Sequence, residues 1–133
     1  MISKVFYKGD LRTEAIHIDS GEKLTTDAPK DNEGQGEFFS PTDLVATALA
    51  SCILTIMGIV AKRSNLNILE ACAEVQKTMG SNPRRIKEVR IKIIFKNKLK
   101  LKDREKLERA AKTCPVGMSL SEKLNEVIEF IYL

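Results

Sequence analysis

The sequence predicts an α+β fold in a single domain over residues 1–133, in which antiparallel β-sheets pack with one long central helix. First, the 18 residues from Leu44 to Ala61 carry no charge, as in a helix enclosed by other elements. Second, short runs of alternating apolar and polar residues flank this stretch on both sides, as in half-buried strands. Third, the chain contains no internal repeat, low-complexity tract or linker, and its length and 43% hydrophobic content suit one core.

The N-terminal third has the pattern of an antiparallel hairpin or meander. Val5 and Tyr7 alternate with polar neighbours, residues 15–19 alternate again, residues 20–22 form a turn, and residues 23–26 return. Residues 28–39 contain Pro, Asn and two Gly, which predict a loop. Two aromatic residues end this loop, and we expect them to pack against the first turns of the helix that follows: Phe38 and Phe39.

The central helix is expected over residues 41–63. Ser40 and Asp43 form a capping-box pattern around Pro41, and Lys62 and Arg63 complement the C-terminal end of the helix dipole. Eighteen uncharged residues approach the length of a membrane span, which is the alternative. Polar residues within the stretch dilute its hydrophobicity, so we expect a helix buried in protein, with no membrane partner.

Residues 70–79 and 86–95 alternate as strands, and the segment 80–83 predicts a hairpin turn between them. A second helix is expected over residues 103–113. Its buried stripe follows helical spacing and includes one cysteine: Leu107, Ala110, Ala111 and Cys114. Ser119 and Glu122 suggest a short helical turn, and residues 127–133 a final strand.

Positive charge is concentrated between Arg84 and Lys112, where 13 Lys and Arg face 4 Asp and Glu. Such a surface suits nucleic acid or an anionic substrate. However, Arg90 and Lys92 alternate with apolar residues as the outer face of a strand does, and no aromatic stacking platform accompanies them. We therefore expect no nucleic-acid partner.

Three cysteines are too few for a secreted disulfide framework, and their odd number points to free thiols. Cys52 lies within the uncharged stretch, and Cys114 lies before Pro115 at the end of the second predicted helix. Cys72 shares a polar strand face and is interpreted as a bystander. The N-terminus goes directly into strand-like alternation without a signal-peptide pattern, so we expect a cytoplasmic protein.

Other functional motifs are weak. His17 is the only histidine and offers neither a metal cluster nor a catalytic triad. Gly34 and Gly36 lack the strand and helix that a nucleotide-binding loop requires. The sequence therefore predicts neither a metal ion nor a cofactor.

The segment SPTDLVATALASCILTIMGIVAKR around Cys52, together with AAKTCPV around Cys114, resembles the osmotically inducible protein C (OsmC) and organic hydroperoxide resistance (Ohr) family. The order of elements agrees over essentially the whole chain. The resemblance implies an OsmC-like fold, an intertwined homodimer and two active sites at the dimer interface. It also implies that Cys52 attacks the peroxide, that Cys114 resolves the product, and that a dithiol such as a lipoyl group is the reductant.

A thiolate that attacks a peroxide becomes a sulfenic acid, which a second thiol must capture before it oxidises further. Burial in a helix raises the pKa of a thiol, so a cation must lie near Cys52. The family uses an Arg from the N-terminal β region, and Arg12 is the best match. The family's Glu, which holds this Arg and follows the helix-start proline, is replaced here by Thr42.

Two functions remain open from the sequence. The first is a thiol-dependent peroxidase that uses Cys52, Cys114 and Arg12 against small hydrophobic hydroperoxides in oxidative-stress defence. The apolar tail of its substrate is expected to lie against one or more of four side chains: Phe39, Ile53, Ile56 and Met57. The second is an OsmC-like small-molecule-binding or stress protein without peroxidase activity, which the replacement at Thr42 favours.

Overall fold

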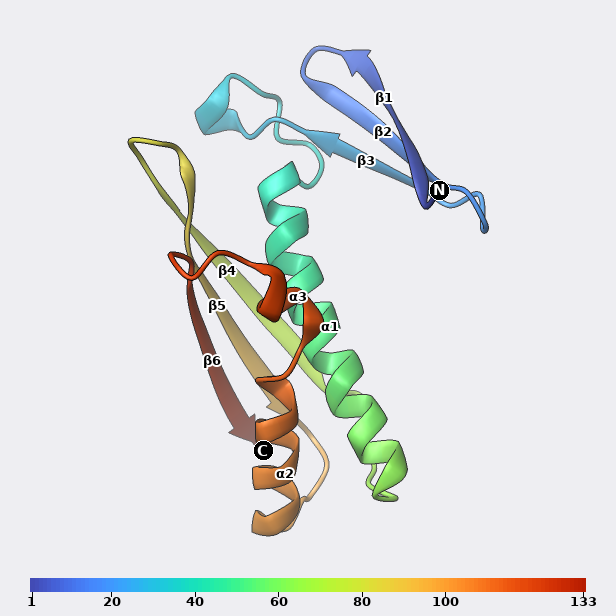
Figure 1. Ribbon diagram of the computed structural model, residues 1–133, viewed down its shortest axis with the longest axis vertical. Coiled ribbons are helices and arrows are strands. Elements are labelled where there is room, and N and C mark those ends of the chain that lie inside the picture. Colours follow the sequence, from blue (N-terminus) through green and yellow to red (C-terminus); the bar gives the residue numbers. More distant parts are fainter. The chain divides into compact units, whose positions relative to one another are not determined.

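The computed structural model describes all residues 1–133 and confirms the α+β class. The chain forms two compact units, residues 1–45 and 46–133, and each contains a three-stranded sheet (Figure 1). The boundary between the units falls within the long helix.

The N-terminal unit is an antiparallel meander, as its alternation predicts. Its strands are β1 (Ser3–Gly9), β2 (Arg12–His17) and β3 (Lys23–Asp27), in the order β1-β2-β3. The tight turn between β1 and β2 places Gly9, Asp10 and Leu11 at positive φ. One turn of 3-10 helix, η1 (Lys30–Asn32), interrupts the predicted loop.

Helix α1 (Pro41–Arg63) has the predicted bounds, and the capping box explains where it begins. The Ser40 hydroxyl accepts a hydrogen bond from the Asp43 backbone N–H at 3.0 Å. The Asp43 carboxylate in turn accepts one from the Ser40 N–H at 2.9 Å. Two backbone donors that would otherwise lack helical partners are thus satisfied at the start of the helix.

Helix α1 is buried on only one face of this chain. Leu49, Ile53 and Met57 are completely buried, whereas the opposite face exposes Ser51, Thr55 and Ile59. The prediction that this helix is buried in protein therefore holds for the face that carries Leu49, Ile53 and Met57. Helix α1 is also long and apolar enough to cross a membrane, but the core helix of a soluble protein meets the same criteria.

The second sheet contains β4 (Cys72–Gly80), β5 (Arg85–Phe95) and β6 (Asn125–Tyr132), in that order. Strands β4 and β5 form the predicted hairpin, but β5 and β6 pair in parallel, so the expectation of purely antiparallel sheets is wrong here. Parallel neighbours need a crossover connection. The chain makes it through α2 (Leu101–Ala111) and α3 (Pro115–Ser119).

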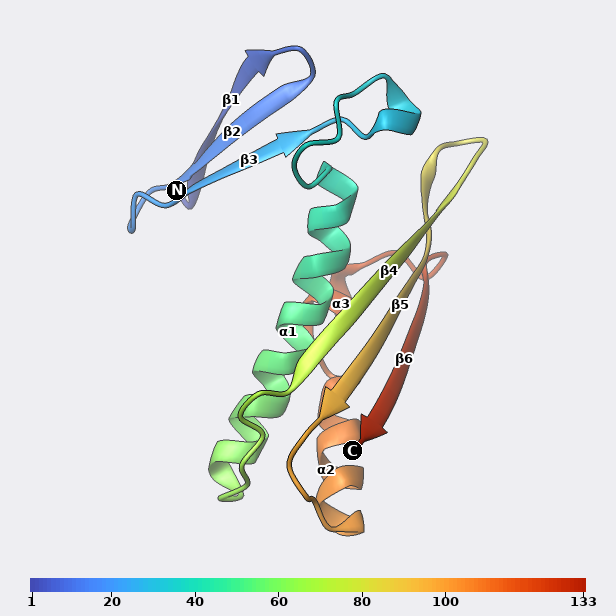
Figure 2. The ribbon, with the colours of Figure 1, turned by 180° about the vertical axis from the view of Figure 1, so that it is seen from behind.

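Figures 1 and 2 show α1 and α2 on the same face of this second sheet. Four residues of β5 point toward the helices, and each is fully buried: Val89, Ile91, Ile93 and Phe95. On the other face, Arg90 pairs with Glu129 at 2.9 Å and with Glu88 at 3.3 Å. The interpretation of the strand's basic residues as an outer face is therefore confirmed.

The region around Cys114 differs from the prediction. Helix α2 ends at Ala111, so Cys114 is not part of it but forms the N-cap of α3. The expectation of a short helix beginning at Ser119 is wrong. The short helix α3 lies before this position and ends at Ser119. Proline is favoured at the first position of a helix, so Pro115 begins α3 as well as ending the preceding segment.

An aromatic and charged cluster fastens α2 to the end of β6. The Tyr132 hydroxyl donates to the Glu108 carboxylate at 2.7 Å, and the Arg104 guanidinium lies 4.3 Å from the centre of the Tyr132 ring. Phe95 stacks on the same ring with the centroids 5.0 Å apart. Burial, followed by the hydrogen bond to Glu108, raises the pKa of Tyr132 above its usual value. The phenol therefore stays neutral and keeps donating.

Candidate redox site

Cys52 and Cys114 come together in the C-terminal unit. Cys52 is partly exposed on α1, and Cys114 is 2% exposed at the start of α3. Cys52 lies near enough to Cys114 to raise the pKa of the Cys114 thiol. The packing of Leu49, one turn before Cys52, against the α3 backbone at Gly117 brings the two helices together at this point.

The two thiols differ in their surroundings. Burial is the main cause that raises the pKa of Cys114, and the neighbouring Cys52 raises it further. The Gly117 backbone N–H donates to Cys114 Sγ at 3.4 Å and partly opposes this shift. Cys114 is therefore a protonated thiol at neutral pH and is unsuited to attack a peroxide first.

Gly117 allows α3 to approach its neighbours closely. A Cβ atom at this position would lie 3.2 Å from Glu126 Oε1 and 3.4 Å from Leu49 Cδ1. The Glu126 carboxylate would have to shift by a few tenths of an ångström to admit a side chain here, whereas the distance to Leu49 is an ordinary contact. The small residue thus lets α3 pack directly against Leu49 of α1.

Two of the expected substrate contacts are wrong. Ile53 and Met57 are completely buried against the sheet, because they belong to the core face of α1, and no ligand reaches them in this arrangement. Ile56 is partly buried and Phe39 is about half exposed, so both stay available. A surface hollow of about 450 Å³ lies between α1 and β4, and its lining is mostly small or apolar: Thr47, Ala50, Ser51, Leu54, Thr55, Ala73 and Val75.

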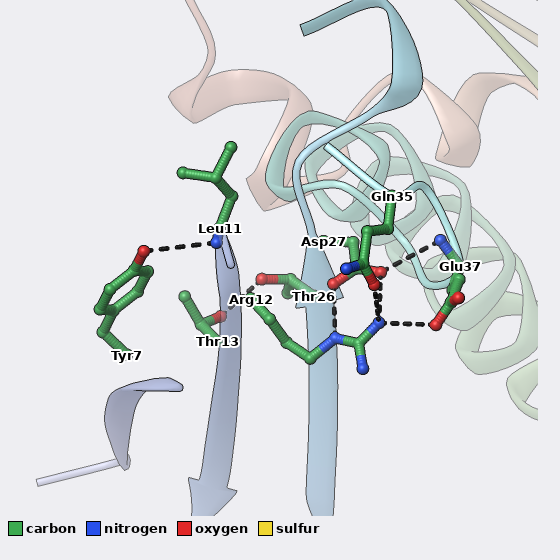
Figure 3. A network of polar contacts seen from close by, with 8 residues as sticks. All are labelled: Tyr7, Leu11, Arg12, Thr13, Thr26, Asp27, Gln35 and Glu37. Atoms are coloured by element: carbon green, nitrogen blue, oxygen red, sulfur yellow. Dashed lines mark hydrogen bonds and ion pairs between the residues drawn. The ribbon is translucent and has the colours of Figure 1, made fainter. Parts of the chain in front are cut away.

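In the N-terminal unit, Arg12 is the centre of a polar network (Figure 3). Its guanidinium forms a bidentate ion pair with Asp27, in which Nε donates to Oδ1 at 2.7 Å and Nη2 donates to Oδ2 at 2.9 Å. Nη2 also donates to Glu37 at 2.7 Å and to Gln35 at 3.2 Å. Phe38 lies over the guanidinium at 4.8 Å. This loop therefore folds around Arg12.

Asp27 is the buried anchor of this network, with 1% of the residue exposed. The hydrogen bond from Arg12 is the main cause that lowers the pKa of Asp27, and the Glu37 backbone N–H also donates to it at 3.1 Å. These partners in turn raise the pKa of Arg12, first Asp27 and then Glu37. Both ends of the pair therefore stay charged across the physiological pH range.

Sequence reasoning missed Asp27 and Glu37. The signal for Asp27 lay in the meander, because Arg12 and Asp27 are direct cross-strand partners on β2 and β3. Thr42, which occupies the family's Glu position, has its hydroxyl 3.2 Å from that of Ser40 at the start of α1. Phe38 and Phe39 both remain about half exposed, so their expected packing against the first turns of α1 stays a prediction.

Cys72 is exposed on β4, opposite Ile94. His17 Nδ1 lies 2.6 Å from the Ser20 hydroxyl at the turn before β3. The structure contains no group of three or more His, Cys, Asp and Glu side chains that could hold a metal ion.

Residues 34–128 match the family model described as OsmC-like protein, a stretch that includes both Cys52 and Cys114. The chain belongs to the OsmC-like family. This confirms the resemblance seen in the sequence. A comparison with curated protein sequences gave no match.

Several solved structures share this fold. A protein of Psychrobacter arcticus 273-4, named for an osmotic stress induced and detoxification response, is 48% identical, with a TM-score of 0.95 over 98% of this chain and 95% of that one. An OsmC-like protein of Mycoplasma pneumoniae is 17% identical, with a TM-score of 0.82 over 98% and 95%. An organic hydroperoxide resistance protein OsmC of Legionella pneumophila is 17% identical, with a TM-score of 0.78 over 98% and 95%.

Proposed function

We propose that this OsmC-like protein is a thiol-dependent peroxidase that reduces organic hydroperoxides in defence against oxidative stress. The observation that carries the proposal is the proximity of a partly exposed cysteine, Cys52, to a buried one, Cys114. A peroxide can reach the first thiol, while the second is held beside it and shielded from solvent. The detoxification role named for the Psychrobacter relative agrees with this function.

The reaction runs in three balanced steps. The Cys52 thiolate attacks one oxygen of the hydroperoxide, the O–O bond breaks, and the alcohol leaves after taking a proton, so Cys52 becomes a sulfenic acid. Cys114 then attacks that sulfur and releases water, forming a Cys52–Cys114 disulfide. A dithiol reductant, such as a lipoyl group, returns both cysteines to thiols and is itself oxidised to a disulfide.

Arg12 is proposed as the cation that favours the Cys52 thiolate. Asp27 and Glu37 would then orient the Arg12 guanidinium in place of the carboxylate that is missing at Thr42, because both form ion pairs with it in this chain. A fixed Arg is more useful than a free one, since its side chain need not be ordered during the reaction.

A small-molecule-binding or stress protein without peroxidase activity is the second candidate, and one observation favours it. Arg12 already faces two carboxylates, so its positive charge is locally compensated. A compensated cation lowers the pKa of a thiol less than a free one does. In that case the hollow lined by Leu54 and Val75 would hold an apolar ligand instead of a substrate.

The protein is also proposed to act as a homodimer in the cytoplasm. The exposed face of α1 carries almost no charge, and a second copy would remove it from water. Size-exclusion chromatography with light scattering tests this: a dimer should have twice the chain mass of 14.9 kDa. A stable monomer at micromolar concentration would contradict the assembly, whatever the outcome of the activity assay.

The direct test of the function is a peroxidase assay coupled to dihydrolipoamide, with cumene hydroperoxide and hydrogen peroxide compared. We expect turnover with both and a higher kcat/KM with the organic substrate, whose tail gains apolar contacts. Mass spectrometry should find a Cys52–Cys114 disulfide after one equivalent of peroxide. The absence of turnover with either substrate would favour the binding protein.

A further inference from the structure

Helix α2 carries an exposed line of cations that the proposed reaction does not use. Lys102, Lys106, Arg109 and Lys112 are all exposed and follow one another at helical spacing. Of the three acidic residues on the helix, only Glu105 is exposed. The other two, Asp103 and Glu108, are half-buried, and Glu108 is occupied by the Tyr132 hydroxyl.

The end of α1 extends this surface. Lys62 and Arg63 are exposed in its last turn, and Lys106 Nζ lies 2.6 Å from the hydroxyl of Ser64, which directly follows α1. The two helices therefore meet here, and their cations form one surface, which we call the basic stripe: Lys62, Arg63, Lys102, Lys106, Arg109 and Lys112.

The basic stripe contrasts with three basic residues in and directly after β5. Arg90, Lys92 and Lys96 each lie within 4.0 Å of a carboxylate, so their charges are compensated within the chain. The six side chains of the stripe form no such ion pair. Their field is available to a partner, and adjacent like charges gain most when an anionic surface covers them.

The position of the stripe indicates what the partner does. Its last member, Lys112, is two residues from Cys114, which is buried beside Cys52. A molecule seated on α2 is thereby held beside the segment that carries Cys114. The reaction needs one partner in every cycle, namely the dithiol that reduces the disulfide.

We infer that the basic stripe docks an acidic protein that carries the dithiol reductant. This inference rests on the proposed function. One thiolate of the dithiol attacks a sulfur of the Cys52–Cys114 disulfide and forms a mixed disulfide, and its second thiol then displaces the remaining protein thiol. Two electrons pass to the protein, and the dithiol leaves as a disulfide. Charge complementarity raises the rate of encounter and makes that rate depend on salt.

A protein is favoured over a nucleic acid on this surface. Helix α2 carries no aromatic residue on which a base could stack. Nor would a nucleic acid return electrons to a disulfide, whereas an acidic protein with a dithiol arm supplies both the charge and the chemistry.

The experiment compares three reductants at concentrations below KM. These are free dihydrolipoamide and two peptides of equal length that carry a reduced lipoyl-lysine, one flanked by about six Glu and the other by the same number of Gln. At low salt we expect the Glu peptide to have roughly tenfold higher kcat/KM than the Gln peptide. About 0.5 M salt should remove this advantage.

The test variant is Lys106→Glu/Arg109→Glu, and the matched control is Lys87→Glu, an exposed lysine of β5 outside the stripe. The test variant should lose the Glu-peptide advantage and retain its rate with dihydrolipoamide, while the control should keep both. If the double reversal disturbs folding, Lys106→Gln/Arg109→Gln should still lose most of the advantage. Equal rates with the two peptides, or an equal loss in the control, would overturn the inference.

A failure of the proposed function gives a different result. If no reductant supports turnover, fluorescence anisotropy with the labelled Glu peptide still examines the surface. Binding that the test variant loses and the control keeps would support a docking surface for acidic proteins. No binding, or tighter binding of a single-stranded oligonucleotide of equal charge, would reject it.

Discussion

The two sheets of this protein are held by different forces. In the C-terminal unit, the inner face of β5 is fully buried from Val89 to Phe95 in alternate positions. In the N-terminal unit, the buried residues are polar, namely Thr26, Asp27 and Ser40, while apolar side chains of β1 are exposed, Val5 at 63% and Tyr7 at 68%. The C-terminal unit has an apolar core, whereas the N-terminal unit is organised by hydrogen bonds and an ion pair.

The residues proposed to take part in the reaction divide in the same way. The thiols of Cys52 and Cys114 lie on the apolar framework, where burial sets the pKa of Cys114. The proposed cation, Arg12, lies in the polar unit, where Asp27 and Glu37 raise its pKa. Changes of the core should therefore affect folding first, while changes of the polar network should affect chemistry first.

The largest expected effect is the removal of the attacking thiol. Cys52→Ser should abolish peroxide consumption, because no nucleophile remains. Cys114→Ser should allow one turnover and then accumulate sulfenic or sulfinic acid on Cys52, visible as added oxygen by mass spectrometry. Cys72→Ser is the control and should behave like the wild type. Slow oxidation of all three cysteines at similar rates would show that no thiol here is activated.

The contrast between the two sheets can be tested by truncating one side chain in each. Ile91→Ala should lower the free energy of unfolding by about 2–5 kcal/mol, because it leaves a cavity in a closed core. Val5→Ala should change it by no more than about 0.5 kcal/mol. Urea unfolding measures both. A cost of several kcal/mol for Val5→Ala would show that β1 is covered in the assembled protein.

Removal of the cation should have an intermediate effect. Arg12→Ala is expected to raise the pH at which Cys52 is alkylated by about one to three units, since the thiolate loses a positive neighbour. Arg12→Lys should retain part of the effect, because the charge remains but the two-pronged pairing is lost. An alkylation profile equal to that of the wild type would remove Arg12 from the site and direct attention to Arg84 or Arg85.

The smallest expected effect is at the cluster that fastens α2. Tyr132→Phe removes the hydrogen bond to Glu108 and should cost about 1 kcal/mol at neutral pH. The pKa of Tyr132 is raised in the folded protein, so its contribution is complete below about pH 10 and is lost as the pH rises through the folded value. The wild type should therefore lose its advantage at strongly alkaline pH and become the less stable of the two, because burial penalises the phenolate and Phe carries no charge. A constant difference would assign the effect to packing.

The sequence predicted local elements well because their signals are local. The bounds of α1 follow from Ser40, Asp43 and the closing cations, and these residues act within a few positions of one another. The alternation in residues 86–95 likewise predicted which side chains of β5 are buried. A cap or a face needs no knowledge of distant partners.

Non-local pairings were harder to predict. Alternation is the same in parallel and antiparallel strands, so it could not reveal how β6 joins β5. The contact of Arg12 with Glu37 spans 25 positions and depends on the path of a loop. Cys114 is buried as its spacing predicted, but as the cap of α3. The roles of Cys52, Cys114 and Arg12 in catalysis stay predictions.

The crossover between β5 and β6 also sets when the thiol pair can exist. Cys52 and Cys114 are about 60 residues apart in the chain. Cys114 lies in the connection between β5 and β6, and this connection is closed only when the two strands pair, beginning with Glu88 and Asn125. Contacts of this kind form late, because closing a long loop loses conformational entropy before the strand pairing offsets that loss. A nascent chain therefore carries three ordinary thiols. The rapid appearance of a Cys52–Cys114 crosslink after addition of an oxidant would report that folding is complete.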